Sequence, residues 1–334
     1  MLDTDKELFR IINTKIKKNI SFIEEIATAL EVNYDAAYRR IKGKTKLSLN
    51  DSVKLSKYFN VSLNDLYLLG DDSKIFIRKT QEIKNFKSLE EYYRIIQQRL
   101  KPIEYNNDAT MYYSAKELPV FHLLYDTQLL RFKLYVWLQI LGKDNYSKKI
   151  KFEDFVIPDS LIQVSLVIGE QYRRVKIIEM WSSNIINSTL HQIQYFYEAN
   201  LLSYKNAIII LNDLKKTIKS IEETAHVGER NNSNKTKYEL YYNPLLNSNN
   251  NVLVSVSNYK VLYMSYSVLR YYEIEDEKVC DNMEDFFNNQ IILSKQITKS
   301  GIKDILLFFK PLYRQINDLV KQINLHKQFP IQKF

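Results

Sequence analysis

Cysteine and glycine are scarce in this chain of 334 residues, and their scarcity excludes several kinds of site. A single cysteine, Cys280, rules out an internal disulfide framework and a zinc site built from several cysteines. The six glycines are scattered, so the sequence contains no glycine-rich loop of the kind that binds phosphate groups. We interpret Cys280 as a buried, unreactive thiol and predict no cofactor.

Long apolar runs are also missing. No stretch of eighteen apolar residues occurs, so we expect no membrane-spanning helix and no membrane partner. The first ten residues, MLDTDKELFR, are polar and acidic and do not resemble a signal peptide. Together with the single cysteine, these features predict a cytoplasmic protein.

Residue types that carry catalysis are few and dispersed. The four histidines are far apart in the sequence. Glu222 and His226 have the four-residue spacing of metal ligands on one helix face, but no zinc-protease motif surrounds them. Cys280 has no local motif of a nucleophile. We therefore interpret the Glu222 and His226 pair as a surface pair, and predict that the protein has no metal site and is not an enzyme.

The composition is that of a soluble globular protein, with 45% hydrophobic and 26% charged residues, and the length suffices for two or three domains. The net charge of +9 is compatible with a polyanionic partner. Its distribution is more informative, because five basic residues and no acidic residue lie between Arg39 and Lys46. Elsewhere charges of both signs are mixed, as on a solvated surface.

Residues 21–46 have the pattern of two short helices joined by a tight turn and followed by a basic loop. A capping box is indicated at the start of the first helix by Ser21 and Glu24. Asn33 is a good N-cap for the second helix, which ends before Gly43. Apolar residues fall at helical spacing on the inner side of both helices, at Ile23, Ile26, Ala27, Leu30, Ala37 and Ile41.

The second helix leaves long hydrogen-bond donors on its outer side, which is typical of a helix that enters a DNA groove. Arg39 can pair with guanine and Asn33 with adenine, whereas Asp35 either accepts from cytosine or stabilises the helix N-terminus. Lysines nearby are candidates for phosphate contacts. A bundle with a merely solvated basic face is the alternative. The predicted DNA-binding residues are Asn33, Tyr34, Asp35, Tyr38, Arg39, Lys42, Lys44, Lys46, Lys17 and Lys18.

Residues 4–69 resemble the lambda-repressor-like, or Xre-type, helix-turn-helix domain. The resemblance rests on IEEIATALEV as the positioning helix, NYDAAYRRIKGKTK as the recognition helix and its exit, and LSLNDSVKLSKYFNVSLNDLYLL as two closing helices. The family often has glycine in place of Glu31 and glutamate in place of Ile41. If Glu31 is left-handed, this costs roughly 1 kcal/mol. The resemblance implies a transcriptional regulator that binds double-stranded DNA.

We place a domain boundary at the turn cluster 70–73. This gives a helix-turn-helix domain over 1–72, a helical linker over 73–102 and a regulatory domain over 103–334. The fold class is predicted to be mainly α, with a larger, mostly helical domain that carries a small antiparallel β-sheet. A β-hairpin is expected around 238–274. Helices are predicted over 121–141, 158–181, 184–199, 204–223, 281–298 and 302–323. In the first domain, helices are also predicted over 4–18 and over 49–59, the latter with Leu49 on its buried stripe, and Ser62 is expected to cap a fifth helix.

Two apolar stripes, along 204–223 and 302–323, are long enough to pair across a two-fold axis, so we expect a homodimer. Packing within the domain is the alternative for the first stripe, because it spans only two heptads. The aromatic-rich C-terminal region could line a pocket for a small-molecule or peptide effector. Two other functions remain open. One is a signal receptor or protein-interaction module with a vestigial helix-turn-helix, and the other is an enzyme domain fused to a regulator.

Overall fold

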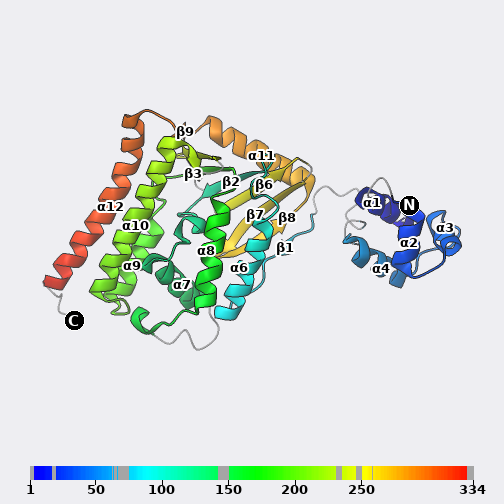
Figure 1. Cartoon of the computed structure of the whole chain (residues 1–334), viewed down its shortest axis with the longest axis horizontal. Helices are drawn as coiled ribbons and strands as arrows, with labels where there is room; N and C mark the ends of the chain where they lie inside the picture. The colour runs from blue at the N-terminus through cyan, green and yellow to red at the C-terminus, as the bar shows by residue number, and fades with distance from the viewer. Residues whose placement is uncertain are drawn as a thin grey trace. The chain divides into compact units, whose positions relative to one another are not determined.

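The computed structural model describes residues 4–16, 20–61, 63, 66, 75–141, 150–230, 235–245, 250–257 and 259–328. The chain divides into two compact units, residues 1–76 (unit 1) and residues 77–334 (unit 2). The helices of unit 1, blue in Figure 1, are α1 (Thr4–Lys15), α2 (Phe22–Leu30), α3 (Tyr34–Ile41) and α4 (Leu49–Phe59).

Unit 1 is organised around one small apolar core. α1 to α4 each contribute fully buried side chains to it, among them Ile12, Ile26, Ala37 and Leu55. The four helices predicted for this region are therefore confirmed. Leu49 was expected on the buried stripe of α4 but is 79% exposed, because it is the first residue of that helix. The predicted fifth helix, capped by Ser62, and the turn cluster 70–73 lie almost wholly outside the described residues.

Of the two helix N-caps predicted for residues 21–46, the structure confirms one and contradicts the other. The Asn33 side chain accepts a hydrogen bond from the Ala36 backbone N–H at 2.9 Å, which confirms the predicted N-cap of α3. The predicted capping box at Ser21 is wrong, because Ser21 makes no side-chain capping bond. Glu31 is left-handed, with φ 57°, which is the conformation that often selects glycine here.

Unit 2 is an α/β structure built on one mixed sheet, whose strands run in the order β1-β8-β7-β6-β2-β3-β5-β4, with β9 also paired to β5. β2, β3 and β5 pair in parallel, and the other pairs are antiparallel. The strands are β1 (Arg78–Lys79), β2 (Thr110–Ala115), β3 (Ile177–Trp181), β4 (Glu229–Arg230), β5 (Thr236–Tyr242), β6 (Asn251–Val256), β7 (Tyr259–Ser267), β8 (Arg270–Ile274) and β9 (Lys295–Gln296).

The predicted mainly α fold with a small antiparallel sheet is wrong. Its main error lies in 158–181, which was expected to be one helix. The helix ends at Tyr172, and residues 177–181 form β3, which lies between β2 and β5 in the sheet. Four of these five residues are buried, so the strand is an apolar run without alternation, and periodicity cannot distinguish such a run from a buried helix.

The predicted hairpin is confirmed over 251–274, because β6 pairs with β7 and β7 with β8 in antiparallel register, whereas residues 238–242 belong to β5 and pair in parallel with β3. Most predicted helices are also present, although 121–141 is divided into a 3₁₀ turn and a helix. The helical segments of unit 2 are α6 (Phe86–Leu100), η1 (Val120–Leu123), α7 (Gln128–Leu141), η3 (Phe152–Asp154), α8 (Asp159–Tyr172), α9 (Asn187–Glu198), α10 (Tyr204–Val227), α11 (Glu277–Ile292) and α12 (Ile302–Gln328).

Helical segments cover both faces of the sheet, as successive residues of β2 show. The Tyr112 ring lies 5.5 Å from the Phe287 ring of α11, whereas the Tyr113 ring lies 6.5 Å from the Phe121 ring of η1. Side chains of adjacent strand residues point to opposite faces, so α11 and η1 lie on opposite sides. Figure 1 shows α11 on one side and α6 and α8 on the other. This arrangement buries the central strands on both faces.

The two apolar stripes that we expected to pair between protomers face each other within unit 2. α10 and α12 pack together, with the Tyr313 hydroxyl donating to Glu222 at 2.5 Å and Lys215 donating to Asn317 at 3.2 Å. The apolar residues of both stripes are buried in one core. Packing within the domain is therefore the correct interpretation of 204–223. Among the described helices, none is long and apolar enough to cross a bilayer.

Candidate functional site

The outer side of α3 and the loop after it carry most of the residues predicted to contact DNA. Tyr34 is 50% exposed and Tyr38 is 37% exposed, so both rings are open to a partner. Two predicted residues, Lys17 and Lys18, lie outside the described residues. The others are all exposed and form what we call the α3 surface, namely Asn33, Tyr34, Asp35, Tyr38, Arg39, Lys42, Lys44 and Lys46.

The neighbouring arginines Arg39 and Arg40 have different surroundings. Arg40 is partly buried, and its guanidinium lies 3.3 Å from the Asp51 carboxylate of α4. Ala37 faces the core, and Arg39, two residues further on, lies on the opposite side of the helix and is exposed. Arg40 therefore anchors α3 to α4 and leaves Arg39 available to a partner.

The basic loop is held against the end of α3. Gly43 has φ +70°, and the backbone N–H of Lys44 donates to the Arg39 carbonyl at 2.8 Å. This left-handed glycine ends the helix, as the sequence predicted, and turns the chain so that Lys44 and Lys46 follow directly on the α3 surface.

The positive charges of the α3 surface are not neutralised by the part of the chain that the structure describes. Within it, Arg39, Lys42, Lys44 and Lys46 make no ion pair. The Lys42 ammonium lies 5.8 Å from the centre of the Tyr38 ring, a contact that keeps its charge. The surface can therefore attract an anionic partner.

A second arrangement, which the sequence did not reveal, centres on Glu179 in β3. This carboxylate is completely buried. The His122 Nε2 of η1 lies 2.8 and 3.0 Å from its two oxygens. Arg230 donates to it at 3.2 Å and Tyr238 at 3.1 Å, and the Tyr172 hydroxyl also donates to it. We call these five residues the Glu179 cluster.

Arg230 is held on several sides within this cluster. Its guanidinium carbon lies 4.6 Å from the Tyr172 ring centre and 4.1 Å from that of Tyr238. It also donates to the Tyr172 backbone carbonyl at 3.3 Å. Cation–π contacts of this kind are strongest when the cation is desolvated. The cluster therefore ties η1, α8, β3, β4 and β5 together at one buried point.

The electrostatic balance of the cluster favours an ionised Glu179. Burial by itself would raise the pKa of this carboxyl, but the charges and hydrogen bonds of His122 and Arg230, with the hydroxyl of Tyr172, lower the pKa to about 2. The pKa values of the Tyr172 and Tyr238 hydroxyls are raised, first by burial and then by the adjacent carboxylate. Both tyrosines therefore remain protonated donors.

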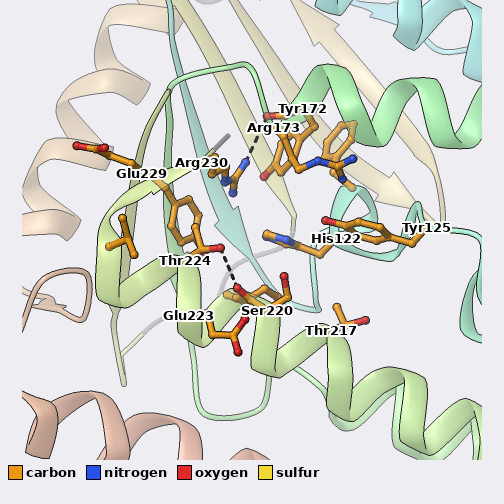
Figure 2. A pocket seen from close by; sticks show the side chains of 14 residues that line it. His122, Tyr125, Tyr172, Arg173, Thr217, Ser220, Glu223, Thr224, Glu229 and Arg230 are labelled. Atoms are coloured by element: carbon orange, nitrogen blue, oxygen red, sulfur yellow. Dashed lines mark hydrogen bonds between the residues drawn. The ribbon is translucent and has the colours of Figure 1, made fainter. Parts of the chain in front are cut away.

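A pocket of about 270 Å³ lies beside the Glu179 cluster, lined in part by His122, Tyr172 and Arg230 (Figure 2). Figure 2 shows Thr217, Ser220 and Thr224 along the side formed by α10. Hydroxyls, charged groups and an imidazole meet here, so the pocket can hydrogen-bond a small polar molecule.

Arg173 contributes a further donor to this pocket. Its guanidinium carbon lies 4.7 Å from the Tyr125 ring centre, and one of its nitrogens pairs with Glu170. The other terminal nitrogen, Nη1, is buried without a hydrogen-bond partner among the described residues. A carbonyl or carboxylate oxygen of a bound molecule would satisfy this donor.

Polar groups that converge on a pocket are what the enzyme alternative requires. Among them, His122 is hydrogen-bonded to Glu179. Within the residues that the structure describes, no group of three or more His, Cys, Asp or Glu side chains is arranged to hold a metal ion. Cys280 is buried, and burial raises the pKa of its thiol to about 11.

The sequence held one signal for the Glu179 cluster. An acidic residue inside the apolar run IIEMW is unusual, because a fully buried carboxylate needs partners. The partners could not be identified from the sequence, since His122, Tyr172, Arg230 and Tyr238 come from four other segments.

Comparison with protein-family models, with curated proteins and with solved structures finds no match for this chain. Inferences about its function therefore depend on its own residues.

Proposed function

We propose that this protein is a sequence-specific DNA-binding transcriptional regulator. The observation that supports this proposal is the α3 surface. Arg39 and two exposed tyrosines project from one short helix, and exposed lysines follow it directly. Base-reading donors on a helix, flanked by cations that suit phosphates, are what major-groove recognition requires.

The test is selection of bound fragments from random and genomic double-stranded DNA by the full-length protein. An enriched motif a few base pairs long, or a pair of such motifs, is expected. Binding without enrichment, or no binding, would instead favour the alternative of a signal receptor or protein-interaction module whose helix-turn-helix is vestigial.

Arg39→Ala is expected to weaken binding to the selected site by roughly 1–3 kcal/mol and to relax the preference at one base pair. The reason is the exposed position of Arg39 on α3, without an ion pair in the described chain. Competition titrations with specific and random DNA measure the effect. An equal loss on both DNAs would assign Arg39 to a phosphate contact.

Lys44→Ala is expected to weaken binding to every sequence by a similar factor, because a lysine in the loop after α3 suits a phosphate and not a base. Titration of binding against salt concentration should give a slope lower by about one unit than that of the unmodified protein. An unchanged slope would mean that Lys44 remains in solvent in the complex.

We also propose that the protein binds DNA as a homodimer, since one recognition helix reads too few base pairs to select a site from a genome. The stripes of α10 and α12 are buried inside unit 2, so the dimer interface must use other surfaces. Light scattering of the full chain should give twice the monomer mass, and the selected site should contain two related half-sites. A monomer on a single half-site contradicts the proposal.

A further inference from the structure

A larger and far more apolar pocket lies between α6 and the strands β6, β7 and β8. It encloses about 500 Å³, which is within the size range of small-molecule sites. We call it the α6 pocket, and Figure 1 shows α6 over these strands. Its walls are mostly apolar and combine aliphatic residues such as Val252, Val254 and Leu100 with aromatic residues such as Phe121 and Tyr271.

The α6 pocket is also lined by a residue with a buried polar group. Tyr93 of α6 is 1% exposed, and its hydroxyl has no hydrogen-bond partner in the described part of the chain. Burial raises the pKa of this phenol, so it remains protonated and able to donate. A buried donor without an acceptor is unfavourable, and a ligand oxygen would remove that cost.

Two cations line the α6 pocket, Lys79 and Arg99. Lys79 is exposed to solvent, and Arg99 is already neutralised. The Arg99 guanidinium lies 2.7 Å from the Glu273 carboxylate and donates to the Tyr263 hydroxyl at 3.0 Å. A ligand carboxylate would have to compete with Glu273, whose side chain is 7% exposed. A ligand without charge avoids this competition and suits the apolar walls.

We propose that the α6 pocket binds a neutral, mainly apolar small molecule that carries one hydrogen-bond-accepting oxygen, which Tyr93 contacts. Lys79, Thr80 and Gln81 also line the pocket. They are among the first residues of unit 2, so the ligand contacts the segment that follows unit 1 in the chain. The ligand is an effector of DNA binding only if the proposed function is correct. Ligand binding itself can be tested without DNA.

The binding test uses the full-length protein and the neutral fluorescent probe N-phenyl-1-naphthylamine. A saturable rise in fluorescence is expected. Decanol and decanoate then serve as competitors with the same chain and different charge. Decanol should displace the probe at a concentration at least tenfold lower than decanoate. If no saturable signal appears, the proposal that the α6 pocket binds a ligand is wrong. If decanoate displaces the probe better than decanol, the proposal that the ligand is neutral is wrong.

Two variants locate the site. Val254→Phe fills the pocket and should abolish the probe signal, with folding checked by circular dichroism. Tyr93→Phe keeps the aromatic ring and removes only the donor, so displacement by decanol should weaken about fivefold to tenfold while probe affinity changes less than twofold. Tyr195→Phe, at a 65% exposed residue of α9, is the matched control and should change neither. Equal effects of Tyr93→Phe and Tyr195→Phe overturn the role of Tyr93.

Tyr93→Phe has a second readout that needs no ligand. Since the hydroxyl makes no hydrogen bond in the described structure, its removal should leave the thermal unfolding midpoint unchanged or slightly higher. A clear fall in the midpoint would show that the hydroxyl has a structural partner. Finally, a change in DNA affinity on adding decanol would test the effector role, and its absence would leave the binding result intact.

Discussion

Glu179→Gln is expected to lower the free energy of unfolding of unit 2 by about 3–5 kcal/mol, because it leaves the buried guanidinium of Arg230 without its counter-charge. The change preserves the shape of the side chain, so packing is little altered, but it removes the charge and replaces one accepting oxygen with a donating amide nitrogen. Urea denaturation followed by circular dichroism measures the effect. Glu223→Gln is the matched control, since that side chain is 67% exposed and should change stability by less than about 0.5 kcal/mol.

A double-mutant cycle separates charge from packing in the same cluster. Arg230→Met removes the cation that Glu179→Gln leaves unpaired, so the double variant should be less destabilised than the sum of the two single variants. Additive losses would show that the two groups do not interact, and would contradict the central role of their ion pair.

The destabilisation of Glu179→Gln should also depend on pH. The pKa of Glu179 is lowered from 4.5 to about 2 in the folded protein, so its ionised form contributes stability that is fully present above pH 4.5. This contribution is lost as the pH falls toward 2. The difference in stability between the unmodified protein and the variant should therefore be constant near neutral pH and decrease below about pH 4.5. A difference that grows on acidification would contradict the assignment.

Leu55→Ala is expected to destabilise unit 1 by about 2–5 kcal/mol and to reduce DNA binding with it. Leu55 is completely buried in the small core that holds α3, and a unit of this size has only a few kcal/mol of stability to lose. Differential scanning calorimetry of the full chain should show a lower transition for unit 1 and an unchanged transition for unit 2, because the units have separate cores.

Leu49→Ala is the matched control for this prediction, since it makes the same chemical change in the same helix at a 79% exposed side chain. It should leave both transitions and DNA binding almost unchanged. If the two variants behave alike, the core of unit 1 does not depend on Leu55. If both transitions fall together in Leu55→Ala, the units do not unfold independently.

The sequence by itself determined the parts of this protein that depend on near neighbours. Asn33 lies three residues from the backbone N–H that it caps, and the four helices of unit 1 follow from apolar spacing over a few turns. The hairpin of β6 and β7 was equally accessible, because its alternating strands are adjacent in the chain. The same helical spacing predicted the exposure of the α3 surface, since the apolar residues of α3 lie on the opposite side of the helix.

Tertiary structure alone decided the sheet of unit 2 and the Glu179 cluster. β2, β3 and β5 are separated by more than fifty residues, and parallel neighbours leave no turn signal in the sequence. Burial on both faces also removes the alternation that marks a strand, which is why residues 177–181 resembled the end of a helix. Glu179 acquires its charge partners only when five segments meet, so its low pKa and its role belong to the folded chain.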